Sequence, residues 1–61
     1  MKEKIKQLIA EHLIRRGALK ITLHNYKATG VLTDAIRDRI LDEINEIDSV
    51  IEKLKEILKA I

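Results

Sequence analysis

Residues 40–61 read ILDEINEIDSVIEKLKEILKAI and carry an aliphatic side chain at every third or fourth position. This alternation of three and four is the heptad pattern of a helix with one apolar seam. Asp34 near the start and Lys59 near the end suit the dipole of a single helix. We therefore predict a helix over residues 34–60. Its seam consists of Ile40, Ile44, Ile47, Ile51, Leu54, Leu58 and Ile61, flanked by Leu41, Val50 and Ile57, as in the core of a bundle.

The first half of the chain repeats the same spacing and predicts a second helix over residues 2–29. His12 and Arg16 interrupt its seam, and Gly17 costs about 1 kcal/mol relative to alanine inside a helix. The alternative is a short strand at residues 19–24, where apolar and polar residues alternate, giving a helix-strand-helix dimer. The second seam consists of Ile5, Ile9, His12, Arg16, Leu19, Leu23 and Tyr26.

The turn between the two helices is predicted at residues 28–34, close to the middle of the chain. Gly30 can adopt the left-handed conformation that ends a helix. Thr33 or Asp34 can accept hydrogen bonds from the first free N–H groups of the next helix. Residues 1–61 therefore form one all-α domain, an antiparallel helical hairpin.

A second apolar stripe lies on the side of the first helix opposite its seam. The chain has 61 residues and no cysteine, so a lone hairpin would bury little surface and would have no disulfide to stabilise it. We expect a homodimer in which two hairpins form a four-helix bundle. Gly17 lies in this stripe, where a glycine would let a second helix approach closely. The alternative is that Gly17 only marks the end of a helix and has no part in an interface. The predicted dimer interface consists of Ala10, Ile14, Gly17 and Ile21, and His24 and Ala28 continue the stripe.

Charge is distributed unevenly between the two halves. Residues 1–30 hold seven Lys or Arg against two Glu, and residues 31–61 hold five against eight acids, so the halves carry +5 and −3. Opposite charges favour placing the halves side by side, within one chain or between chains.

No pattern of catalytic, cofactor-binding or metal-binding residues is present in the sequence. His12 and His24 are twelve residues apart, which is no metal-ligand spacing, and the chain has neither cysteine nor a glycine-rich phosphate loop. Acidic residues spaced along a helix are typical of a solvated face. We therefore expect no enzyme activity, no cofactor and no bound metal, and no motif assigns the chain to a known family.

These observations favour a non-catalytic interaction module, a small dimeric adaptor or regulator that presents charged helix faces to a protein partner. No apolar run exceeds two residues, so we expect no membrane association and a cytoplasmic location. The alternative function is a nucleic-acid-binding accessory protein that uses the basic residues of the first helix. Its candidate contacts are Lys2, Lys4, Lys6, Arg15, Arg16, Lys20 and Lys27.

Overall fold

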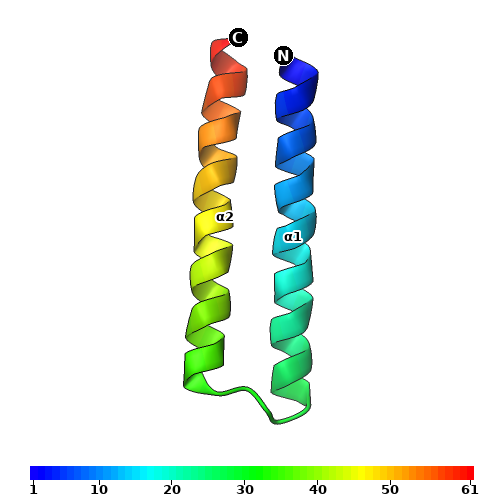
Figure 1. Cartoon of the computed structure of the whole chain (residues 1–61), viewed down its shortest axis with the longest axis vertical. Helices are drawn as coiled ribbons and strands as arrows, with labels where there is room; N and C mark the ends of the chain where they lie inside the picture. The colour runs from blue at the N-terminus through cyan, green and yellow to red at the C-terminus, as the bar shows by residue number, and fades with distance from the viewer.

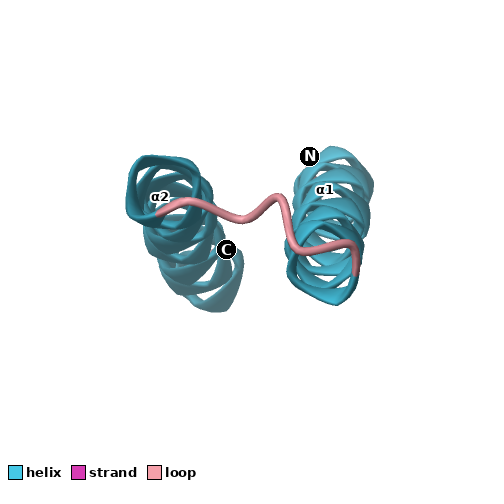
Figure 2. Ribbon diagram, turned by 90° about the horizontal axis from the view of Figure 1, so that it is seen from below, coloured by secondary structure: helices cyan, strands magenta, loops and turns pink.

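The chain folds as two long antiparallel helices joined by a short linker (Figure 1). The computed structural model describes residues 1–61; helix α1 spans Lys2–Ala28 and helix α2 spans Asp34–Ala60. The chain termini lie together at one end and the linker at the other, and Figure 2 views the two helices from the linker end. The predicted hairpin is therefore confirmed, with the first helix one residue shorter than expected.

Two alternatives from the sequence are excluded by helix α1. Residues 19–24 are helical, so the strand interpretation is wrong, and the chain contains no strand. Gly17 lies in the middle of α1 and does not end a helix. The β-branched residues in this segment are tolerated because the hydrogen bonds of a long continuous helix outweigh a weak local preference for strand.

The end of α1 is closed by a Schellman motif. The N–H of Val31 donates to the carbonyl of Tyr26 over 3.1 Å, and the N–H of Gly30 donates to the carbonyl of Lys27 over 3.3 Å. Gly30 has a φ of +74°, a left-handed conformation that costs a residue with a Cβ about 1 kcal/mol. Gly30 therefore has the conformation predicted for it.

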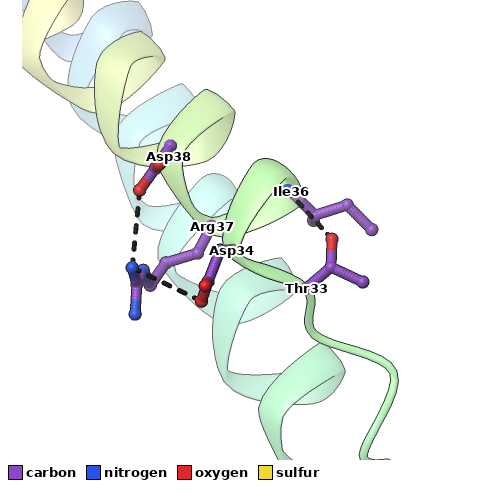
Figure 3. A network of polar contacts seen from close by, with 5 residues as sticks. All are labelled: Thr33, Asp34, Ile36, Arg37 and Asp38. Carbon is purple, nitrogen blue, oxygen red and sulfur yellow. Dashed lines mark hydrogen bonds and ion pairs between the residues drawn. The ribbon is translucent and has the colours of Figure 1, made fainter.

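The start of α2 is capped by Thr33, as predicted. Its hydroxyl oxygen accepts a hydrogen bond from the N–H of Ile36 over 3.2 Å (Figure 3). Asp34 does not cap the helix; its carboxylate lies 3.6 Å from the guanidinium of Arg37, which also lies 3.6 Å from Asp38 (Figure 3). These exposed ion pairs neutralise part of the charge of the first turns of α2.

The buried core is a single row of isoleucines, and α2 supplies most of it. Only Ile5 of α1 is buried, at 7 % exposure. The rest of the α1 seam is half-buried, and Tyr26 at its end is 38 % exposed. Two helices alone shield only the sides that face each other, so the core stays narrow. The buried residues of α2 are Ile40, Ile44, Ile47 and Ile51.

Candidate self-association site

The outer stripe, which we define as Ala10, Ile14, Gly17 and Ile21, lies on the side of α1 that faces away from α2. Within one chain the Ile14 side chain is 73 % exposed and the Ile21 side chain is 64 % exposed. Spacings of four, three and four residues align the stripe along one helix face. The structure therefore brings together the four residues predicted as an interface and leaves their apolar atoms in water.

Gly17 has no role in packing within the chain. A Cβ built at this position meets no atom within 4 Å, and its φ is not positive. Glycine nevertheless lowers the stability of a helix interior by about 1 kcal/mol relative to alanine. Gly17 would have a steric purpose only if something outside the chain approached the backbone of α1 closely.

The two histidines are not brought together. His12 lies in the seam, half-buried, and its Nδ1 donates to the carbonyl of Leu8 over 2.7 Å within the same helix. His24 is exposed toward the end of α1. His12 is therefore a hydrogen-bonded residue between the helices, with no second histidine beside it.

Arg16 joins the two helices through Asp48. Its Nε lies 2.6 Å from the Oδ1 of Asp48, and the two side chains are 32 % and 44 % exposed. The other ion pairs lie within a single helix. The Arg16–Asp48 hydrogen bond therefore links the two helices, and it explains how an arginine occupies a seam position.

We expect Arg16→Gln and Asp48→Asn to be coupled by about 0.5–1 kcal/mol in a double-mutant cycle, because this charged hydrogen bond is only partly shielded from water. Urea unfolding of the single and double variants measures the coupling. Arg37→Gln with Asp38→Asn is the matched control, since that pair is longer and exposed, and its coupling should be close to zero. Equal coupling in the two cycles would contradict the assignment.

The basic residues of α1 do not form one continuous surface. At 3.6 residues per turn, Lys6, Lys20 and Lys27 fall on one flank of α1, together with Lys2. Arg16 is held by Asp48 between the helices, which neutralises the middle of this flank. The remaining candidates, Lys4 and Arg15, fall on the opposite flank.

One apolar surface was only partly found from the sequence. Leu41, Val50 and Ile57 were predicted to flank the seam, but the prediction did not assign them to its two sides. Nine residues, or two and a half turns of helix, separate Leu41 from Val50, so these two lie on opposite sides of the seam. Ile36, which is 36 % exposed, lies on the side of Val50 and was missed. The seven-residue spacing from Ile36 through Glu43 to Val50 and Ile57 is the signal that identifies this surface.

The rest of the surface is without cavities. There is no pocket, and no group of three or more His, Cys, Asp or Glu side chains is placed to hold a metal ion. Neither helix combines the length and the apolar character needed to cross a membrane. No protein-family model, curated protein or solved structure matches this chain.

Proposed function

We propose that this protein is a non-catalytic helical interaction module that works as a homodimer, in which two hairpins form a four-helix bundle through the outer stripe of α1. The observation that carries the proposal is the exposure of Ile14 and Ile21 on either side of Gly17, a helical glycine that the single chain does not need. A second helix crossing at Gly17 would bury both isoleucines and would use the close approach that glycine permits.

The exposed surface area of the chain supports the same proposal. One hairpin exposes 4851 Å². A compact monomer of 7.0 kDa exposes roughly 4,000 Å². The excess of about a fifth arises because two helices have no third layer to cover their outer sides. Association with another chain is one of the ways in which so small a protein buries such surface.

The charge of the two helices suits an interaction module. Residues 2–28 carry seven bases and two acids, and residues 34–60 carry five bases and eight acids. Each hairpin therefore presents a basic helix beside an acidic one. Such separation orients a charged protein partner during its approach more than it adds to affinity.

Light scattering at micromolar concentration tests the proposal, and the expected mass is about twice 7.0 kDa. Gly17→Leu should weaken the dimer at least tenfold, because the larger side chain blocks the approach of the second helix while leaving the hairpin folded. Lys4→Leu is the matched control, since Lys4 is also exposed on α1 but lies about a quarter turn or more around the helix from every residue of the stripe. A mass of one chain at all concentrations would overturn the proposal.

A further inference from the structure

A second apolar surface runs along α2 and is separate from the outer stripe. We call it the α2 flank and define it as Ile36, Val50 and Ile57, which are 36 %, 39 % and 49 % exposed. Seven-residue spacing places these side chains on one line beside the buried seam, over about 31 Å of helix, with the half-buried Glu43 between Ile36 and Val50. The seam of α2 faces α1, whereas the flank beside it is only partly covered within the chain.

The same side of the hairpin is also apolar on α1 near the chain termini. On α2, Val50 and Ile57 come directly before the seam residues Ile51 and Leu58. In an antiparallel helix pair, the residues of α1 that come directly before every second seam residue lie on this same side. On α1 these residues are Leu8, which is half-buried, Arg15 and Thr22. The opposite side of the hairpin carries six charged residues, Lys6, Lys20, Lys27, Asp34, Asp48 and Lys55, and two exposed leucines, Leu13 and Leu41. One side of the hairpin is therefore richer in apolar residues, and the other is mostly charged.

We propose that the α2 flank packs against the same side of a second copy of this chain, with α1 of each copy lying over α2 of the other. The contact rests on the proposed function in that the chain associates with itself, but it uses different residues from the outer stripe. The partner is a second copy of this chain for two reasons. The charges of α1 and α2 are complementary, and the exposed area of the chain agrees with the area that a homodimer buries.

Charge selects how the two copies are arranged. A two-fold axis parallel to the helices stacks α1, with its excess of basic residues, on α2, with its excess of acids, and makes every neighbouring helix antiparallel. It also places both linkers at the same end. A two-fold axis across the helices would instead stack α1 on α1 and bring Arg15 close to its own copy. The first arrangement is therefore favoured.

The surface area of the chain agrees with a contact that spans both helices. Two separate chains expose twice 4851 Å², or about 9,700 Å². A compact protein of twice the mass exposes roughly 6,700 Å². The difference of about 3,000 Å² is typical of obligate homodimers. The outer stripe runs along one helix only. The side of the hairpin that carries the α2 flank includes residues of both helices, so a contact there can be two helices wide along the 46 Å length of the molecule.

The two contacts lie on different sides of the hairpin, so both can form at once. The wild-type protein should therefore pass from pairs to larger assemblies as its concentration rises. Sedimentation equilibrium from about 1 to about 500 µM measures this, and circular dichroism at each concentration checks that the helices remain folded. The expected mass at the upper end exceeds twice 7.0 kDa.

Paired lysine substitutions separate the two contacts. Val50→Lys with Ile57→Lys should leave only dimers formed through the outer stripe, and Ile14→Lys with Ile21→Lys should leave only dimers formed through the α2 flank. All four substitutions together should give single chains of 7.0 kDa. Asn45→Lys with Ser49→Lys adds the same charge to exposed positions away from the flank and should change nothing.

Each outcome decides one of the two proposals. If Val50→Lys with Ile57→Lys leaves the wild-type masses unchanged, the α2 flank contact is wrong. If Ile14→Lys with Ile21→Lys leaves them unchanged, the outer stripe is not the dimer contact. Should the lysine variants unfold, Val50→Ala with Ile57→Ala replaces them, and the same reduction in mass is expected at higher concentration.

Disulfide trapping tests the arrangement of the copies, because the chain has no cysteine of its own. Arg16 lies beside Asp48, so in the antiparallel pair Arg15 lies level with Ser49, one residue from Val50. A chain with Arg15→Cys mixed with a chain carrying Val50→Cys should form linked mixed dimers under oxidation. Linkage of the Arg15→Cys chain to itself, with no mixed product, would overturn the stacking of α1 on α2.

Discussion

Ile47→Ala is expected to remove most of the stability of the hairpin. Ile47 is 5 % exposed and lies in the middle of the only buried row of side chains. Truncating a buried isoleucine costs about 2–5 kcal/mol. A folded chain of 61 residues has a total stability of about 3–9 kcal/mol. The loss is therefore comparable with the whole stability, and thermal unfolding followed by circular dichroism should show a melting temperature lowered by well over ten degrees.

Leu41→Ala is the control for this core substitution. Leu41 is on the same helix, is 41 % exposed and belongs to neither proposed contact. Its truncation removes a similar number of atoms from a site that is already partly in water, so the expected cost is below about 1 kcal/mol. Equal effects of Ile47→Ala and Leu41→Ala would show that the row of isoleucines is not the core.

The helices and the turn were predictable because their causes are local in sequence. The heptad spacing of Ile40 to Ile61 defines α2 without reference to the rest of the chain. Gly30 and Thr33 end one helix and begin the next through hydrogen bonds that span three to five residues. Such interactions are encoded within one or two turns of the backbone, so a single sequence reveals them.

The contacts between the helices were less predictable because they depend on register. The sequence places Arg16 and Asp48 on helices that face each other, but only the folded chain brings their atoms to 2.6 Å. Tyr26 was expected in the seam and is 38 % exposed, because the helices end near it and leave little to pack against. Burial at a seam position depends on what the partner helix places opposite, which spacing alone does not specify.

The outer stripe was predictable as a line of residues but not as an interface. Periodicity alone aligns Ala10, Ile14, Gly17 and Ile21 on the side opposite the seam. The structure adds that Gly17 has no neighbour within the chain and that the isoleucines remain exposed. The association that would bury them lies between chains, and its geometry is not contained in the spacing of one helix.

Dilution is expected to lower the melting temperature of the wild-type protein. If folding and association occur together, each tenfold dilution removes about 1.4 kcal/mol from the stability of the dimer. The unfolding entropy of a dimer of two 61-residue chains is about 0.26 kcal/mol per degree, so the expected shift is about 5 °C for each tenfold change.

Thermal melts at about 1, 10 and 100 µM therefore test whether the exposed isoleucines are buried in solution. The chain that combines Ile14→Lys and Ile21→Lys with Val50→Lys and Ile57→Lys is the matched control, because it keeps the buried row of isoleucines and removes both contacts between chains. Its melting temperature should be lower than that of the wild type at every concentration and should not change on dilution. A wild-type melting temperature that stays within one degree over the same range would mean that the hairpin is stable alone, and that Ile14 and Ile21 face water in the working protein.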